Sequence, residues 1–521
     1  MSRPAAPPAP RFSPEELSVL LGEKNKPTAE QSAIISSPLA PRLVIAGAGS
    51  GKTATMADRV VWLVANGWVR PEEVLGVTFT RKAAGELATR IRAKLLALQR
   101  LAAKDTSHDV FPQGLLSSDA LEPKVSTYHS FASGIVSDYG LRLGVERDVV
   151  LLGGAQAWQL ASEVVEAFDG EYAHFRAAKS TLVKAVIQLA GECAEHLQEP
   201  EDVEAWLMGR LAEFEALPYL ADKKKNPPQA AAELAGMLRT RASVADMVGR
   251  YAAAKRARGA LDFGDLVALA ARVAREVPLA AKMERQRYKV VLLDEFQDTS
   301  YAQLVLFSRL FGGGHAVTAV GDPNQSIYGF RGASAGQLFH FVREFPVHTG
   351  GPGDTDSWSP APTSYLTTAW RNGRSILAAA NVMSQALGKA AARRGPAGGG
   401  VAAAEVPPLQ PSPFAVDGAV VLGRFASDVD EAAALADDVL KYRVTDFEHN
   451  PDGSAVSPAL AVLCRRRTQM ETIRRQFEAR GIAYEIVGLG GLLDTPEIVD
   501  LVATLRVLAD PGRSDALMRL L

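Results

Sequence analysis

Adjacent carboxylates at Asp294 and Glu295 directly follow the apolar run Val290–Leu293. Carboxylate oxygens bind Mg²⁺ readily, and a carboxylate beside the metal can polarise an attacking water. An exposed acidic strand end is also common and inert, so this pair alone is weak support for catalysis. The run predicts a buried strand that ends in a candidate metal ligand, Asp294, and a candidate water-activating group, Glu295.

A second polar cluster follows the apolar run Val317–Val320, which predicts a neighbouring strand. Its Gln325 could sense a phosphate, and the rings of Tyr328 and Phe330 could stack on a nucleic-acid base. Without further support, aromatic residues of this kind would be assigned to the core. Together with the carboxylate pair, the cluster suggests a site where nucleotide hydrolysis is coupled to a nucleic acid strand.

A glycine-rich segment lies between an apolar run and a helical pattern near the N-terminus. Glycines allow backbone N–H groups to surround phosphates, and the start of the following helix favours anions. Lys52 can reach the β- and γ-phosphates as a catalytic group, and the Thr53 hydroxyl can ligate Mg²⁺. The segment predicts a nucleotide-binding phosphate loop made of Ala46, Gly47, Ala48, Gly49, Ser50, Gly51, Lys52 and Thr53.

These residues need a parallel sheet to bring them to one edge. From about Phe12 to Arg100, apolar runs alternate with helical patterns, as in a parallel α/β domain. The continuous runs Leu43–Ala46 and Val74–Phe79 predict strands buried on both faces. From about Ala155 to Arg258 the chain is rich in Ala, Leu and Glu, which predicts a helical insertion.

The sheet is expected to resume at Tyr288 and to continue through Val320. Beyond it, stretches rich in Pro and Gly at 345–364 and 387–418 predict loops. A second α/β segment is expected after these loops, with strands at Ala419–Leu422, Ala459–Cys464 and Tyr484–Val487.

Composition places the chain among ordinary globular proteins. Its 521 residues are too many for one core, and its hydrophobic and charged fractions are 47% and 22%. The net charge of −2 means that any nucleic-acid binding must come from a local groove. No apolar run is long enough to span a membrane, and the two cysteines, Cys193 and Cys464, fit a reducing cytoplasm.

Six segments resemble, in order, the motifs of superfamily 1A helicases, the UvrD/PcrA/Rep group. The ordered combination extends from about Gln31 to the C-terminus and is highly specific. Details also resemble the actinobacterial members, including the motor modules of AdnAB-type helicase–nucleases. The segments are Ala46–Thr53, Val77–Ala84, Ser126–Phe131, Leu261–Leu266, Asp294–Thr299 and Val320–Ala333.

The resemblance implies roles for four residues around ATP. Gln31 matches the glutamine that reads adenine, and Gln325 matches the catalytic residue that senses the γ-phosphate. Arg371 matches an arginine finger from a second motor domain, which would stabilise charge in the transition state. Trp370 stands where the family usually has the Tyr that stacks on adenine.

The resemblance also implies a track for single-stranded DNA. Its candidate residues are Phe79, Thr127, His129, Tyr328 and Phe330. Phe330 replaces the usual Trp, but it keeps a face on which a base can stack. Stacking tolerates any base, which suits an enzyme that moves over arbitrary sequence.

The expected fold is a RecA-like P-loop α/β domain with an all-α insertion, followed by a partial second RecA-like domain. The UvrD-like ATP-binding region is expected over about 24–374. The expected parts are a disordered tail at 1–12, a first motor domain at 13–107 and 255–344, a helical insertion at 108–254, and the second domain with flexible loops at 345–521.

The expected activity is that of an ATP-dependent 3′→5′ DNA helicase or single-strand translocase in repair or recombination, using ATP and Mg²⁺. Its partners would be single-stranded DNA and junctions with duplex, and a helicase–nuclease or repair subunit. Later family motifs are not found before Leu521, which favours a fragment of a longer chain. The alternatives are a regulatory module that binds ATP and DNA without unwinding, and the motor part of a helicase–nuclease subunit.

Overall fold

The computed structural model describes most of the chain, with gaps. The described residues are 8–104, 122–146, 149–170, 175, 177–217, 229–329, 335–350, 354, 357–394, 406–445, 448–449, 455–456, 460–487, 496–511 and 514–520. They form two compact units, Met1–Gly418 and Ala419–Leu521.

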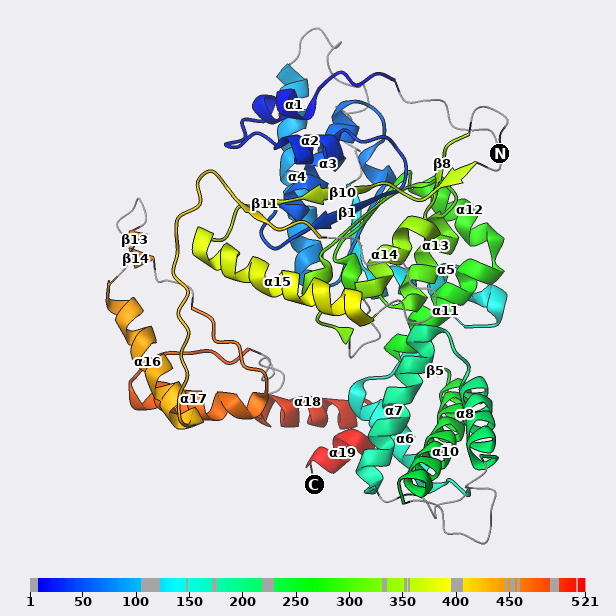
Figure 1. Cartoon of the computed structure of the whole chain (residues 1–521). Coiled ribbons are helices and arrows are strands. Elements are labelled where there is room, and N and C mark those ends of the chain that lie inside the picture. The colour runs from blue at the N-terminus through cyan, green and yellow to red at the C-terminus, as the bar shows by residue number, and fades with distance from the viewer. Residues whose placement is uncertain are drawn as a thin grey trace. The chain divides into compact units, whose positions relative to one another are not determined.

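A six-stranded parallel sheet organises the first unit (Figure 1). Its strand order is β10-β1-β7-β6-β2-β3, so all carboxyl ends lie at one edge. The predicted strands at Leu43–Ala46, Val74–Phe79 and Val290–Leu293 are confirmed within one residue at each end. The strand bounds are β1 Arg42–Ala46, β2 Val74–Thr78, β3 Lys124–Thr127, β6 Val290–Leu293, β7 Ala316–Gly321 and β10 Thr363–Leu366.

Strand β10 was not anticipated, because it lies at the end of a stretch predicted as loop. Its four residues pair in register with β1, and Leu43 lies opposite Thr363. Two further short strands, β8 at Val347–His348 and β9 at Trp358–Ser359, form an antiparallel pair in the same stretch.

Helices cover both faces of this sheet because its strands alternate their side chains between two cores. In β6, Val290 and Leu292 pack with α3 and α4, while Val291 and Leu293 pack with α5, α11, α13 and α14. The helix bounds are α3 Lys52–Ala65, α4 Arg81–Lys104, α5 Tyr128–Tyr139, α11 Phe263–Glu276, α12 Pro278–Arg287, α13 Tyr301–Phe311 and α14 Ala335–Glu344. This two-faced burial explains the continuous apolar runs in the sequence.

Helices occupy the segment predicted as helical, 155–258. The expected bounds of the insertion, 108–254, also include β3 and α5, which belong to the six-stranded sheet and its core. Three helices of the insertion, α6, α7 and α10, share a core of their own that includes Leu160, Val183, Met247 and Tyr251. A short parallel pair, β4 at Val150–Leu151 and β5 at Ala260–Leu261, lies where the insertion begins and ends. The helix bounds are α6 Gly154–Glu166, α7 Lys179–His196, α8 Pro200–Glu215 and α10 Gln229–Ala257.

Part of the expected N-terminal tail is held against the first unit. Phe12 is buried, its carbonyl accepts a hydrogen bond from Trp62 Nε1 at 2.7 Å, and its N–H donates to Asn66 at 2.9 Å. The expectation of a disordered tail is therefore wrong for residues 8–12, because side chains at the end of α3 and just after it bind the backbone of Phe12 and Pro8. Residues 1–7 lie outside the described residues.

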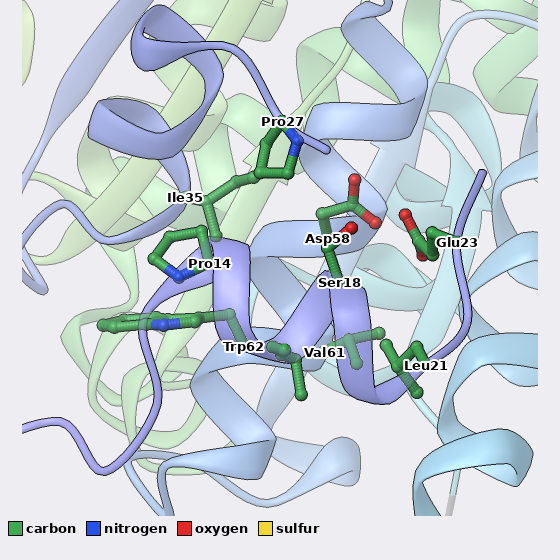
Figure 2. Close-up of a pocket in the computed structure, with 10 residues that line it drawn as sticks. Pro14, Ser18, Leu21, Glu23, Pro27, Ile35, Asp58, Val61 and Trp62 are labelled. Carbon is green, nitrogen blue, oxygen red and sulfur yellow. The ribbon is translucent and has the colours of Figure 1, made fainter. Parts of the chain in front are cut away.

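A small cavity lies where helix α1, Pro14–Leu20, packs beside α3 (Figure 2). Its volume is about 20 Å³, and it is lined by Leu21, Ile35, Val61 and Trp62 together with Glu23 and Asp58 among others. This space is comparable to a single water and cannot hold a nucleotide base. The cavity is therefore a small packing defect between the helices and not a ligand site.

Two elements of the first unit follow the sheet. The parallel pair of β11, Thr368–Ala369, and β12, Gln410–Pro411, is separate from the six-stranded sheet. Helix α15 spans Arg374–Arg394, and it is linked to this pair through Asn381, whose side chain bonds both backbone groups of Leu409.

The described residues of the second unit form helices and one short strand pair. Helix α16 packs on α17 through Ala436, Val439, Phe477 and Ile482. Ile473 and Phe477 form the apolar face of α17 in this cluster, and Gly481 follows the helix with a φ of 63°. The bounds are α16 Asp428–Thr445, β13 Glu448–His449, β14 Ala455–Val456, α17 Arg467–Ala479, α18 Pro496–Ala509 and α19 Ser514–Leu520.

The strands predicted at Ala419–Leu422, Ala459–Cys464 and Tyr484–Val487 are wrong for the residues described there. These segments are not strands, and Leu422 and Leu463 are 96% and 94% exposed. Residue 459 lies outside the described residues. A strand requires a hydrogen-bonded neighbour, and the described part of the chain supplies none to these apolar runs. Of the helices that the structure describes, none combines the length and apolar character needed to cross a membrane.

Candidate nucleotide site and adjoining groove

The phosphate loop connects β1 to α3 at the carboxyl edge of the sheet. Gly49 and Gly51 adopt φ angles of 74° and 83°, a conformation that glycine reaches without steric cost. The turn allows α3 to begin at Lys52, so its first N–H groups face the loop. Ser50 Oγ is buried and has no hydrogen-bond partner among the described residues, as expected for a group that faces a ligand.

Lys52 and Glu295 lie next to each other at this edge of the sheet. Lys52 Nζ is 3.0 Å from Glu295 Oε2, although the two residues are far apart in sequence. Glu295 has a φ of 50°, and Leu197 is the only other non-glycine residue with positive φ in the described part of the chain. A side chain in this conformation costs free energy, and such strain gathers at functional sites.

Burial controls the protonation of two carboxyls in the same turn. Asp294 is 6% exposed, and this burial together with the charge of Glu295 raises the pKa of Asp294 to about 6. Burial and Glu295 also raise the pKa of Asp298 to about 6. The loss of hydration therefore makes the ionised form of Asp294 costly, and a bound cation would remove that cost.

The residues predicted to bind Mg²⁺ lie at the same edge of the sheet. Thr53 is in the first turn of α3, and Asp294 directly follows β6. A hydroxyl and a carboxylate are the oxygen ligands that Mg²⁺ prefers beside nucleotide phosphates. The donor set fits the ion, which would neutralise phosphate charge when bound.

Gln325 is brought to this edge, but its side chain is engaged within its own turn. Its Nε2 donates to Asp322 Oδ2 at 2.6 Å, just beyond the end of β7. Gln297, which is buried, donates to Glu295 Oε2 at 2.8 Å and accepts from the N–H of Asp322 at 3.0 Å. Gln297 therefore connects the turns that carry Glu295 and Gln325, a link that the sequence prediction missed.

Gln31 lies beside the phosphate loop on helix α2, Ala29–Ile35. Its Oε1 accepts a hydrogen bond from the N–H of Thr28 at 2.9 Å, forming a capping box at the helix start. Its Nε2 would lie 3.0 Å from a Cβ placed on Gly51. The residue thus acts as a helix cap in this structure, while its amide nitrogen faces the nucleotide loop.

Trp370 and Arg371 pack directly against the phosphate loop. The N–H of Trp370 donates to the carbonyl of Gly49 at 2.8 Å, and Arg371 Cβ would lie 2.8 Å from a Cβ on Gly49. Leu409, which directly precedes β12, covers the loop. Its Cδ1 would lie 2.6 Å from a Cβ placed on Gly47. Leu409 carries no motif signature, and sequence reasoning did not find it.

A groove of about 790 Å³ lies between the sheet edge and the helical insertion. Phe79, Thr127 and His129 from the DNA-track prediction line it, with residues of α7 and the start of α11 opposite. The ring of Tyr328 lies 4.6 Å from that of Phe79, between centroids. Phe330 lies outside the described residues.

Phe263 is a candidate that the sequence prediction passed over. It is 54% exposed at the first position of α11, lines the groove, and its ring lies 6.0 Å from that of His129. Buried Lys255 forms ion pairs with Asp262 at 2.6 Å and Asp265 at 2.5 Å, which fixes the start of this helix. The Leu261–Leu266 motif could have indicated Phe263, because an aromatic residue opens a helix there.

Thr127 is primarily a helix cap in this structure. Its Oγ1 accepts from the N–H of Ser130 at 3.2 Å and donates to Ser130 Oγ at 2.9 Å, at the start of α5. The cap holds His129 on the first turn of that helix, at the wall of the groove.

Comparisons with known proteins give family matches along most of the chain. The family model of the UvrD/REP helicase N-terminal domain matches residues 27–346, and that of the UvrD-like helicase C-terminal domain matches 366–521. The second match continues to residue 521, so it does not mark the second domain as partial, as the sequence prediction had it.

Two relatives illustrate the similarity. The ATP-dependent DNA helicase UvrD1 of Mycobacterium tuberculosis is 28% identical over 495 residues, which cover 92% of this chain and 52% of that protein. The ATP-dependent DNA helicase PcrA of Staphylococcus epidermidis is 25% identical over 493 residues, covering 95% of this chain and 55% of that protein. The chain spans about half the length of these curated relatives. With both domain models matched in order, this chain belongs to the UvrD/Rep helicase family.

Proposed function

We propose that this chain is the motor part of an ATP-dependent DNA helicase or single-strand translocase that moves 3′→5′. One observation carries the proposal: a single sheet edge holds Lys52 and Glu295 at 3.0 Å, and Phe79 beside Tyr328 at 4.6 Å. The direction and a role in repair or recombination rest on the family resemblance. An association with a nuclease or repair subunit stays a prediction of the sequence.

The hydrolytic half of the mechanism follows from the phosphate loop. Lys52 would leave Glu295 to bind the phosphates of ATP, which frees the Glu295 carboxylate to polarise the attacking water. Gln325 would exchange its bond with Asp322 for one at the γ-phosphate. Arg371 would stabilise the negative charge that develops there.

Coupling to DNA follows from the turns that end β6 and β7. Gln297 bonds Glu295 on one side and the backbone of Asp322 on the other, and Ser326 Oγ bonds the Gln297 carbonyl at 3.1 Å. A change at the γ-phosphate would therefore be transmitted along a continuous set of hydrogen bonds to the turn that carries Tyr328.

The groove favours recognition of bases over recognition of phosphates. Among its lining residues Glu192, Glu195 and Asp298 are acidic, and Arg81 supplies a positive charge. Carboxylates repel a phosphate backbone, whereas aromatic faces accept any base. The expected ligand is single-stranded DNA with its bases turned toward Phe79 and Phe263.

The decisive test is ATP hydrolysis by this chain with and without a single-stranded oligonucleotide. Stimulation by the oligonucleotide, lost in Lys52→Ala, supports a motor. ATP and DNA binding with no stimulated turnover, and Lys52→Ala equal to the parent, would instead favour the regulatory module. A strand-displacement assay on duplexes with 3′ or 5′ overhangs then tests unwinding and its direction.

Replacing Phe79 by alanine is expected to weaken binding of single-stranded DNA by roughly five- to 150-fold. The loss corresponds to about 1–3 kcal/mol for one stacked base, and it should be similar for oligo-dT and for mixed sequence. Fluorescence anisotropy of labelled oligonucleotides measures it. Trp206→Ala, at a 62% exposed position on α8, is the matched control. Equal affinities for Phe79→Ala and the control would argue against the track.

A further inference from the structure

Thr367 is the residue at which the chain leaves one sheet for another. Residues Thr363–Leu366 form β10 at the edge of the six-stranded sheet, whereas Thr368–Ala369 form β11 and pair with β12. The Thr367 carbonyl accepts from the N–H of Gln410 at 2.8 Å. Three and four residues later come Trp370 and Arg371, so backbone rotation at Thr367 sets their position over the phosphate loop.

Glu30 binds this residue with both of its carboxylate oxygens. The N–H of Thr367 donates to Glu30 Oε2 at 2.8 Å, and Thr367 Oγ1 donates to Glu30 Oε1 at 2.6 Å. Hydrogen bonds to an ionised acceptor are about twice as strong as neutral ones, and two of them fix an orientation. The contact joins residues 337 positions apart in sequence.

Helix α2, which carries Glu30, is itself held to the helix of the phosphate loop. Arg59 on α3 is fully buried and donates to the carbonyls of Ile34, Ile35 and Ser37 at 3.0, 3.0 and 2.9 Å. These carbonyls end α2 or follow it. The short helix is therefore fixed to α3 at one end and to Thr367 at the other.

We infer that Glu30 is a positioning residue that links the adenine-facing helix to the segment that bears Arg371. Glu30 touches neither substrate nor reacting atoms; it acts through Thr367. Gln31 follows Glu30 on helix α2. The same helix therefore positions both the side chain expected to read adenine and the segment that carries Arg371. Loss of the carboxylate should therefore impair the catalytic step more than nucleotide binding.

The test compares Glu30→Gln, Thr367→Val and the double variant. Its kinetic arm rests on the proposed ATP hydrolysis and uses saturating single-stranded DNA. Glu30→Gln is expected to lower kcat roughly ten- to one-hundred-fold with KM within about threefold, since an interaction lost only in the transition state lowers kcat. Thr367→Val keeps its backbone N–H and should lose less. The double variant should be close to Glu30→Gln, because both changes weaken the same two-point contact.

A second readout does not depend on activity. Hydrogen exchange of a peptide that covers 366–372 should become roughly tenfold faster in Glu30→Gln, because a neutral amide oxygen accepts a weaker hydrogen bond from the Thr367 N–H than a carboxylate does. Glu497→Gln, an exposed acidic residue in the first turn of α18, controls for the loss of a charge at a helix start.

The outcomes separate the two ideas. A parent chain without DNA-stimulated hydrolysis contradicts the proposed function, and the exchange experiment still decides the role of Glu30. Unchanged exchange at 366–372 overturns the inference, as does a kcat equal to that of Glu497→Gln in an active parent. A raised KM with unchanged kcat would show that Glu30 supports only Gln31.

Discussion

Replacing Glu295 by glutamine is expected to lower ATP turnover by roughly one hundred- to ten-thousand-fold, the usual contribution of a general base. ATP binding should stay as tight as in the parent or become up to about fivefold tighter. The structure gives the reason: Lys52 forms an ion pair with Glu295 at 3.0 Å, and the lysine must leave it to bind phosphate. A neutral amide removes this competition, which is worth up to about 1 kcal/mol for a partly exposed pair.

Single-turnover hydrolysis and titration with a fluorescent ATP analogue in Mg²⁺ measure the two effects separately. Asp298→Asn is the matched control, because Asp298 lies in the same turn as Glu295. This variant also replaces a carboxylate by an amide, but the ion pair between Lys52 and Glu295 stays intact. Binding weakened more than tenfold in Glu295→Gln would contradict the assigned role, since it would make the carboxylate part of the binding site.

Asparagine at position 294 is expected to stabilise the Mg²⁺-free protein while stopping turnover. Burial raises the pKa of Asp294 to about 6 from an ordinary value of 3.8. The folded protein therefore holds this proton more tightly, and stability is lost as pH rises from about 4 to 6. At pH 7.5 that cost is fully present, so Asp294→Asn should raise the free energy of unfolding by about 1–3 kcal/mol.

Urea unfolding followed by tryptophan fluorescence checks this prediction at pH 7.5 and pH 4 in the presence of a chelator. The stabilisation should shrink at pH 4, because this pH is close to the ordinary pKa of 3.8 and well below the folded pKa of about 6. Turnover should fall by at least about one-hundred-fold at any pH because a ligand of the metal is lost. A variant less stable than the parent at pH 7.5 would contradict the pKa-based argument.

The nucleotide-binding half of the site could be predicted from sequence because its signals are local. Lys52, Asp294 and Glu295 each adjoin a buried strand, and a parallel sheet brings such strand ends together. Their proximity in the structure follows from the strand order β1-β7-β6.

Other contacts were beyond sequence reasoning because they join distant positions without a motif. Leu409 covers Gly47, and Glu30 binds Thr367, through chain paths that no local pattern records. Gln31 differs from these residues, because two local patterns point to it. Its spacing from Thr28 predicts a helix cap, and the family resemblance predicts contact with adenine. The apolar runs after Gly418 were wrongly predicted as strands. An apolar run indicates that a segment favours burial, but it does not show that a neighbouring strand is there to pair with it.

The place of β10 beside β1 has a consequence for synthesis on the ribosome. These two strands pair at the sheet edge next to the phosphate loop, although about 320 residues separate them in sequence. At roughly 5–20 residues per second, β1 leaves the ribosome about 15–60 s before its edge partner. The helical insertion, whose core comes from residues 152–260, is complete well within that interval and can fold first. The nucleotide site is therefore among the last parts of the first unit to close, with the edge of β1 open to nascent-chain chaperones until β10 pairs with it.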